Sequence, residues 1–177
     1  AQFRDPTAWV HFVVSYDVTP STPSASSIKL FVNGAEVTVF DTTPTYAAQN
    51  ADTTLNEASE FNIGRYPAND PGGTYKGYLA ETILVDGTAL NADSFGEYDS
   101  NGVWVPIRPP TSLGTTGFHL DFKSSTVGKD AAGSNNFTAV GMGTNNVVAD
   151  TCSDNSDTEV TLFPCLDSNN KESSLVL

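Results

Sequence analysis

The chain has 177 residues and a formal charge of −13, which comes from 21 acidic and only 8 basic side chains. Such an acidic chain repels polyanions, so we expect neither a nucleic acid partner nor binding to anionic membranes. No apolar run approaches the ~18 residues of a membrane-spanning helix, so membrane insertion is not expected either. Charged residues are 16% of the sequence, and the many Thr, Ser, Asn, Gly and Pro residues are typical of an all-β protein with many turns.

The first strand pattern lies in residues 8–17, AWVHFVVSYD. Its two faces consist of Val10, Phe12, Val14 and Tyr16, and of Trp9, His11, Val13 and Ser15. Because both faces carry apolar side chains, the pattern predicts a central strand over residues 8–16 that is covered on each side. The chain begins with Ala1 rather than Met, shortly before this pattern, so we expect AQFRDP to be an interior point of a larger polypeptide.

A hairpin follows a Pro- and Ser-rich loop over residues 18–27. In IKLFVNGAEVTVF, apolar and polar residues alternate on both sides of Asn33-Gly34. A type I′ turn needs positive φ at both central residues, and Asn-Gly adopts it at little cost. The pattern therefore predicts two paired strands, over residues 28–32 and 36–40.

The middle of the chain alternates between loops and strand patterns. Residues 41–60 are polar and irregular, which indicates a loop. The next two patterns, FNIGRY and TYKGYLAETILVDG, predict strands over residues 60–65 and 75–85. Asp86-Gly87 ends the second strand in a turn.

The last part of the main domain combines one helix with two short strands. The segment TALNADSFGEYD predicts a helix over residues 90–99, capped by Asn91 or Asp93. GVWVPI and GFHLDF predict strands, the second over residues 117–122 with Phe118 and Leu120 on one face. We divide the chain into a domain over residues 1–123 and a loop-rich extension over residues 124–177, in which NNFTAVG and EVTLFP are the strand candidates.

Groups that could catalyse a reaction are few. His11 lies inside a strand pattern, where a hydrogen-bonded or covered side chain is expected, and His119 is expected to face solvent. Glu97 and Asp99 have the spacing of a glycosidase carboxylate pair, but they fall in the helix-to-turn region, and Glu81 is isolated on its strand. We therefore expect a non-enzymatic protein, with a glycan-degrading enzyme as an alternative.

Two further features of the sequence leave alternatives open. Cys152 and Cys165 either form a disulfide, worth roughly 3 kcal/mol, or are free thiols. Two acidic segments could bind Ca²⁺ or simply form turns, since neither matches the ligand spacing of an EF-hand. Their oxygen-bearing residues are Asn69 and Asp70 in the first segment, and Asp154, Asp157 and Glu159 in the second.

One loop has the composition of a sugar-binding site. Tyr66 and Tyr75 bracket Asn69, Asp70 and two glycines. Aromatic rings stack on the apolar face of a pyranose, while amides and carboxylates bind its hydroxyl groups. The same residues also serve as turn formers, so carbohydrate binding and a purely structural loop remain alternatives.

The ordered set of motifs resembles the second half of a laminin-G-like domain of the concanavalin A-like lectin and glucanase superfamily. The matching residues lie between positions 7 and 96 and are Trp9, His11, Tyr16, Asp17, Asn33, Gly34, Ile63, Gly64, Gly77, Leu79, Glu81 and Leu90. This resemblance implies an antiparallel jelly-roll sandwich. The Phe-x-Trp strand that opens such domains is missing, so we expect the first strands to come from an unseen part of the chain or from a second copy, and residues 1–177 alone to be insoluble or multimeric.

The continuation is more particular. FGEYDSNGVWVPI, GTTGFHLDF and GKDAAGSNNFTAVG resemble the laminin-G-like modules of bacteriophage structural proteins, especially those of marine phages. The resemblance implies a virion component, such as a fibre or surface appendage, that contacts copies of itself, other virion proteins and host-surface glycans. An extracellular adhesin domain of a cell is the alternative, since the same fold would serve there. The Glu-x-Asp-x-x-Glu strand of the glucanase branch does not occur in the sequence.

Overall fold

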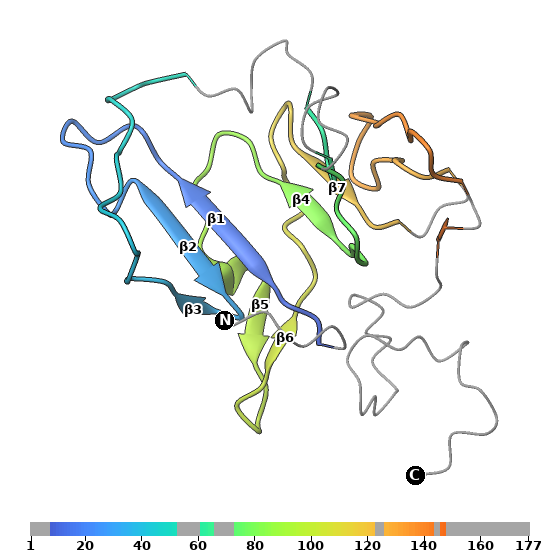
Figure 1. Ribbon diagram of the computed structural model, residues 1–177, viewed down its shortest axis with the longest axis horizontal. Coiled ribbons are helices and arrows are strands. Elements are labelled where there is room, and N and C mark those ends of the chain that lie inside the picture. The colour runs from blue at the N-terminus through green and yellow to red at the C-terminus, as the bar shows by residue number, and fades with distance from the viewer. Residues whose placement is uncertain (1–7, 53–60, 66–72, 123–125, 144–145, 148–177) are drawn as a thin grey trace.

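The computed structural model describes residues 8–52, 61–65, 73–122, 126–143 and 146–147 (Figure 1). The structure is 3% helical and 22% strand, which confirms an all-β protein. Its elements in the described residues are β1 (Phe12–Tyr16), β2 (Ile28–Val32), β3 (Ala35–Glu36), β4 (Thr82–Leu84), the 3₁₀-helix η1 (Ala92–Ser94), β5 (Gly96–Tyr98), β6 (Trp104–Pro106) and β7 (Phe118–Leu120).

The predicted Asn-Gly hairpin joins β2 and β3 in an antiparallel sheet of order β1-β2-β3. Asn33 and Gly34 have φ values of 47° and 80°, as a type I′ turn requires. The strand predicted over residues 36–40 is wrong beyond Glu36. Val39 is 85% exposed, so the alternating pattern there has no described surface to pack against, and pairing alone does not hold so short a strand.

The prediction that the first strand is central and covered on each side is wrong. Within the described residues β1 begins only at Phe12 and pairs with β2 alone, so it is an edge strand. Val13 and Ser15 are buried, whereas Phe12 and Val14 are 53% and 65% exposed. Apolar residues on both faces of a strand therefore did not mean that both faces are covered.

A second antiparallel pair joins β4 to β7. The strand predicted over 75–85 is reduced to Thr82–Leu84, because Glu81 takes a φ of +50°, which interrupts an extended backbone. The strand predicted over 60–65 appears only as a single bridge from Arg65 to Thr74 within the described residues. The strand at residues 117–122 is confirmed over Phe118–Leu120.

In the third pair, β5–β6, strand β5 takes the place of the second part of the helix predicted over residues 90–99. The helical part is limited to η1, and the Asn91 side chain makes no capping hydrogen bond. Tyr98 pairs with Trp104 across the hairpin, and their rings pack edge to face with their centroids 5.0 Å apart. This aromatic pair stabilises a strand where local propensity had favoured a helix. In the extension, the described residues 135–141 of NNFTAVG form no strand.

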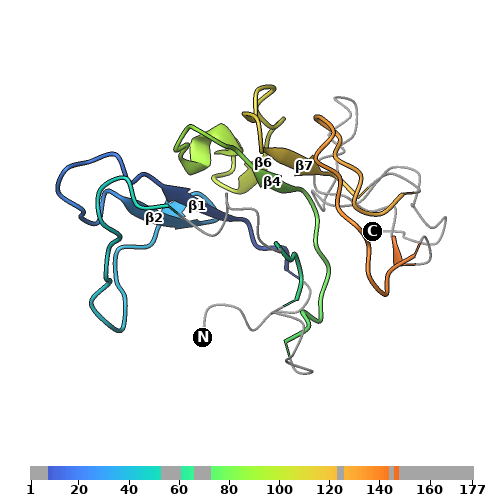
Figure 2. The same cartoon turned by 90° about the horizontal axis from the view of Figure 1, so that it is seen from above.

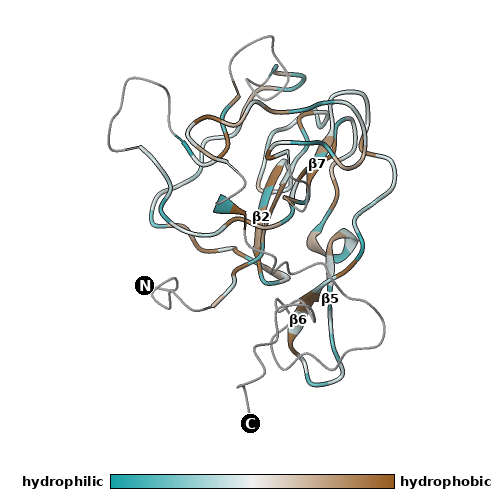
Figure 3. Ribbon diagram, turned by 90° about the vertical axis from the view of Figure 1, so that its right-hand side faces the viewer, coloured by the Kyte–Doolittle hydropathy of each residue, from teal (hydrophilic) through white to brown (hydrophobic). Residues whose placement is uncertain are grey.

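Strands β2, β1, β4 and β7 lie side by side in one layer (Figure 2). The core beside β1 and β2 contains Val13, Phe31 and Ala92, with Phe95 and Trp104 packed against them. A second apolar group contains Leu113, Phe118 and Leu120, with the ring of Phe118 against that of Phe137. Hydrophobic colour is concentrated on β2, β6 and β7, while much of the connecting chain is pale or teal (Figure 3).

Candidate functional site

The sequence-predicted sugar loop lies largely outside the described residues. Of its four named residues, Tyr66, Asn69 and Asp70 are not described, and Tyr75 is. Tyr75 is 55% exposed, and its hydroxyl group donates a hydrogen bond of 3.4 Å to the carbonyl oxygen of Tyr78. Tyr78 is 68% exposed. Two exposed tyrosines therefore follow this loop in the sequence.

The proposed disulfide and the second acidic segment also lie beyond the described part of the chain, since Cys152, Cys165, Asp154, Asp157 and Glu159 fall in residues 148–177. Among the residues that the structure describes, no three His, Cys, Asp or Glu side chains come together as a metal site would require. Within the same residues, no helix has the length and apolar character needed to cross a bilayer.

Glu81 and His119 form an ion pair, although the sequence predicted an isolated glutamate and a solvent-facing histidine. The solvent-facing prediction for His119 is wrong, because β4 and β7 place Glu81 and His119 next to each other at the start of β4, and both side chains are more than four-fifths buried. The prediction for Glu81 concerned a second carboxylate on the same strand, which the contact with His119 does not test. The hydrogen bond that His119 donates to Glu81 raises the pKa of His119, and the negative charges of Glu81, Asp121 and Asp130 also raise it, whereas burial lowers it. The pair therefore favours a positively charged His119.

The other candidate carboxylate pair serves a turn. Asp99 Oδ1 accepts hydrogen bonds from the backbone N–H groups of Asn101 (2.9 Å) and Val103 (2.8 Å). These bonds, that from Val103 first, lower the pKa of Asp99. Asp99 thus holds the β5–β6 turn in place, and Glu97 is exposed on β5. The spacing of Glu97 and Asp99 thus reflects their places in a hairpin, one on the strand and one in the turn, rather than a catalytic pair.

A cluster around Trp104 joins the β1–β3 sheet to the β5–β6 hairpin. Trp104 Nε1 donates to His11 Nδ1 at 2.8 Å, and the two rings stack 6.0 Å apart. The backbone N–H of His11 donates to Asn33 Oδ1, and the Tyr98 hydroxyl donates to the carbonyl oxygen of Asn33. Burial lowers the pKa of His11, which keeps the ring neutral and able to accept from Trp104. The expectation of a hydrogen-bonded His11 is confirmed.

Two glycines allow this cluster to form. A Cβ atom at Gly34, in the β2–β3 turn, would overlap the six-membered ring of Trp104. A Cβ atom at Gly96, on β5, would overlap the same indole. The indole therefore fits between two backbones that no larger residue could line. The Trp104 cluster, consisting of His11, Asn33, Gly34, Gly96, Tyr98 and Trp104, is a close-packed joint.

The outer edge of β7 is closed by the loop around Asp130. This carboxylate is only 2% exposed and accepts hydrogen bonds from the backbone N–H groups of His119, Ala132 and Asn135. Burial raises the pKa of Asp130, but the backbone donors outweigh it and the net pKa is lowered. Ala131 N donates to the carbonyl oxygen of His119, which completes the edge. No signal in the sequence distinguished Asp130 from its neighbours.

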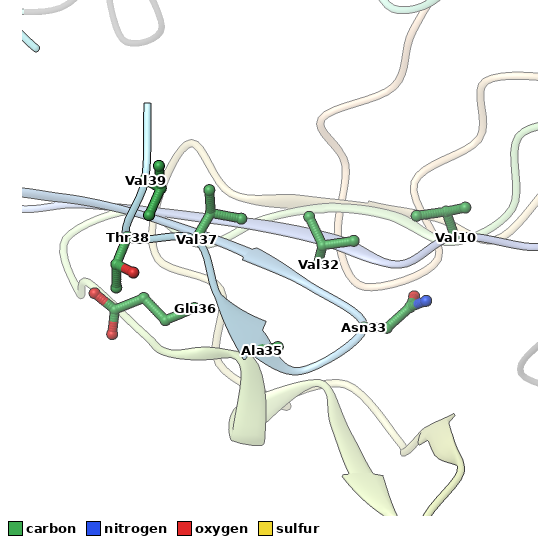
Figure 4. Close-up of a pocket in the computed structure, with 8 residues that line it drawn as sticks. All are labelled: Val10, Val32, Asn33, Ala35, Glu36, Val37, Thr38 and Val39. Carbon is green, nitrogen blue, oxygen red and sulfur yellow. The ribbon is translucent and has the colours of Figure 1, made fainter. Parts of the chain in front are cut away.

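A groove between β1 and β4 has a volume of about 640 Å³. One wall is the run from His11 to Tyr16, and the other is Glu81 with the run from Ile83 to Leu90. A smaller hollow of about 390 Å³ lies beside the β2–β3 turn, where Val10, Val32, Val37 and Val39 point to one side of the ribbon (Figure 4). Both hollows are lined by apolar residues of the β1–β3 sheet and its continuation.

No family model matches the chain, and the comparisons with curated proteins and with solved structures found no match.

Proposed function

We propose that this chain is a non-enzymatic structural protein of a bacteriophage virion, a fibre, appendage or capsid-surface component with a lectin-like module. The observation that carries the proposal is the Trp104 cluster. His11, Asn33 and Gly34, which belong to the laminin-G-like motif set, meet there with the GVWVPI segment of the phage-like continuation. Residues that were matched as separate motifs along the sequence thus contact one another in one joint.

The chemistry-bearing groups of the described residues support a scaffold rather than a catalyst. His11 accepts a hydrogen bond from Trp104, Asp99 and Asp130 bind backbone N–H groups, and His119 pairs with Glu81. A catalytic acid or base must exchange a proton with a substrate, and the backbone N–H groups bound to Asp99 and Asp130 occupy the carboxylate oxygens that would do so. A glycan-degrading enzyme is therefore the less favoured function.

We further propose that the β2-β1-β4-β7 layer is one sheet of a jelly-roll sandwich. The burial pattern of β1 supports this, because Val13 and Ser15 are covered by the core while Phe12 and Val14 face outward. Packed sheets bury the inner faces of both layers, about 10 Å apart. An apolar outer face is what a layer of such a sandwich would present before its partner sheet is in place.

The direct test is to purify particles of the phage that encodes the chain and to search their proteins by mass spectrometry and with an antibody against residues 1–177. We expect the chain in intact particles, at a copy number set by virion symmetry, and antibody labelling on the particle exterior. Recovery in a cell envelope and not in particles would replace this proposal by the cell adhesin.

The lectin-like part is tested separately. Changing Tyr66, Asp70 and Tyr75 together to Ala in intact particles should reduce adsorption to host cells at least tenfold. Unchanged adsorption by particles with the folded variant would assign the loop to the scaffold. Hydrolysis of a host polysaccharide by the purified chain, lost in Glu81→Gln, would contradict the non-enzymatic assignment.

A further inference from the structure

We propose that the groove between β1 and β4 accepts one extended strand, rich in apolar and cationic side chains, donated by another polypeptide. The proposal adds a partner and its chemistry to the structural role proposed above, and the two can fail independently. It rests on the backbone groups of the two walls, on their direction and on the charge of the groove.

The first wall exposes backbone hydrogen-bonding groups of β1. In an antiparallel pair, alternate residues direct both N–H and C=O toward the partner strand. Asn33 N donates to His11 O and Asp17 N donates to Ser27 O, so the odd-numbered residues of β1 face β2. The backbone groups of Val14 and Tyr16 therefore face the groove, and no partner for them occurs among the described residues.

The second wall exposes the corresponding groups of β4. The backbone N–H and C=O of His119 bond to Asp130 and Ala131, on the side of β7 away from β4. His119 and Ile83 are therefore a non-hydrogen-bonded pair, and Ile83 directs its N–H and C=O away from β7. By the same alternation Val85 does so too, and both residues line the groove.

The direction of the walls fixes the direction of the occupant. Figure 1 shows that β1 and β4 run the same way across the layer. All four strand pairs in the described residues are antiparallel. One strand that runs opposite to both walls would pair with each of them and continue the antiparallel order from β3 to β7, which is recognition by β-strand addition.

The groove has an acidic, apolar lining. Asp52, Glu81 and Asp86 line it and neither Lys nor Arg does, while Phe12 and Val14 provide apolar surface beside the open edge of β1. Glu81 is paired with His119, and among the described residues Asp86 accepts a hydrogen bond only from the neutral backbone N–H of Thr116, so Asp52 and Asp86 supply the net negative charge of the lining. Lys or Arg side chains on the occupant would complement these carboxylates, and the excess of negative charge on the whole chain would speed their approach.

A second copy of this chain fits the groove less well. Its best donor is the exposed run from Thr38 to Phe40, which continues a strand pattern and has no backbone partner among the described residues. That run lies between Glu36 and Asp41, so insertion would bring two more carboxylates toward Asp52 and Asp86. Two copies also carry a formal charge of −13 each. Like charges at an interface oppose association.

The test uses two synthetic eight-residue probes, one alternating Val and Lys and one alternating Val and Glu. Binding to the purified chain is measured by fluorescence anisotropy of the labelled peptides, and backbone contact by the exchange rates of the Val14, Tyr16, Ile83 and Val85 amides. We expect the Lys peptide to bind at least tenfold more tightly than the Glu peptide, to weaken at least tenfold between 50 and 500 mM NaCl, and to slow exchange of those four amides.

Two charge variants locate the binding. Asp52→Lys changes a groove residue, and Asp41→Lys makes the same change in charge outside the groove; both positions are exposed. We expect Asp52→Lys to weaken binding of the Lys peptide at least fivefold more than Asp41→Lys. Equal effects of the two variants, equal affinity for the two peptides, or self-association of the chain that Val39→Asp abolishes would each overturn the proposal.

Discussion

Strand β1 takes part in two regions of opposite character. On one side, the backbone of its odd-numbered residues hydrogen-bonds to β2, Val13 packs with Phe95 and Trp104, and hydrogen bonds link His11 to Trp104 and Asn33. On the other side, its even-numbered residues line the groove, with Phe12 and Val14 about half exposed or more. The difference shows that one short strand can be held in place by one face and one edge, while its second face stays exposed and its second edge stays free to pair.

The β4–β7 pair repeats this contrast. The outer edge of β7 is closed by Asp130 and Ala131, while the inner edge of β4 faces the groove. Closed edges are satisfied by specific contacts within the chain, and open edges are templates for pairing with another chain. The predictions that follow perturb the closed regions and the open one in turn.

The largest effect is expected for Gly34→Ala. The new Cβ atom would overlap the Trp104 ring, and Gly34 has a φ of +80°, which residues other than glycine rarely adopt. Together, the steric overlap and the unfavourable backbone conformation should lower the free energy of unfolding by roughly 4 kcal/mol. Gly87→Ala is the matched control, because Gly87 has the same φ with open space around it, and should lose only about 1 kcal/mol. Urea denaturation measures both, and equal losses would show that Trp104 is not packed against Gly34.

Asp130→Ala should lose roughly 3 kcal/mol, because it leaves three backbone N–H groups without their charged acceptor. Asp130→Asn retains an acceptor oxygen and should lose less. The loss should be accompanied by faster proteolysis of residues 126–143, since that loop is anchored to β7 through this side chain. If cleavage is no faster in the alanine variant, the edge of β7 is closed by other contacts.

The sequence predicted the elements whose signals are local and missed those that depend on distant partners. The Asn33-Gly34 turn and the strands around Phe31 and Phe118 follow from turn chemistry and alternation. The helix at residues 90–99 was wrong because the pairing of β5 with β6, with Tyr98 against Trp104, outweighs weak helix signals. Asp130 could not be recognised, because a buried carboxylate that binds backbone N–H groups looks like any other Asp in a polar loop.

The paired positions Val13 and Val14 separate the two faces of β1. Val13 is 8% exposed and Val14 is 65% exposed, although they are identical neighbours. Val13→Ala should lose about 2 kcal/mol through lost burial and the cavity left behind, and Val14→Ala less than about 0.5 kcal/mol. Similar losses at the two positions would mean that the outer face is covered in solution, as a completed sandwich or a multimer would require.

The smallest expected effects are those of pH on the two histidines, and they have opposite signs. Burial lowers the pKa of His11 below its ordinary value of 6.5, so its contribution to stability is present above pH 6.5 and is lost as the pH falls toward the folded-state pKa. Glu81 raises the pKa of His119 above 6.5, so that contribution is complete below pH 6.5 and is lost as the pH rises through the folded-state pKa.

Denaturant midpoints at pH 5.5, 7 and 8.5 check both signs. His119→Gln should lose most stability relative to the unchanged chain at pH 5.5, and the difference should shrink toward pH 8.5. His11→Gln should show the reverse order, with the smallest difference at pH 5.5. Parallel pH profiles for the two variants would contradict the assignment of Glu81 and Trp104 as their respective partners.

Hydrogen exchange along β1 and β4 tests the open groove most directly. In the unliganded chain, measured by NMR at a concentration where it is monomeric, the amides of Val13 and Ser15 should be protected while those of Val14 and Tyr16 exchange rapidly, because only the odd-numbered residues hydrogen-bond to β2. On β4, Leu84 should be protected and Ile83 should not. Equal protection of Val13 and Val14, or of Ile83 and Leu84, would show that the edges facing the groove are already paired and would contradict the account.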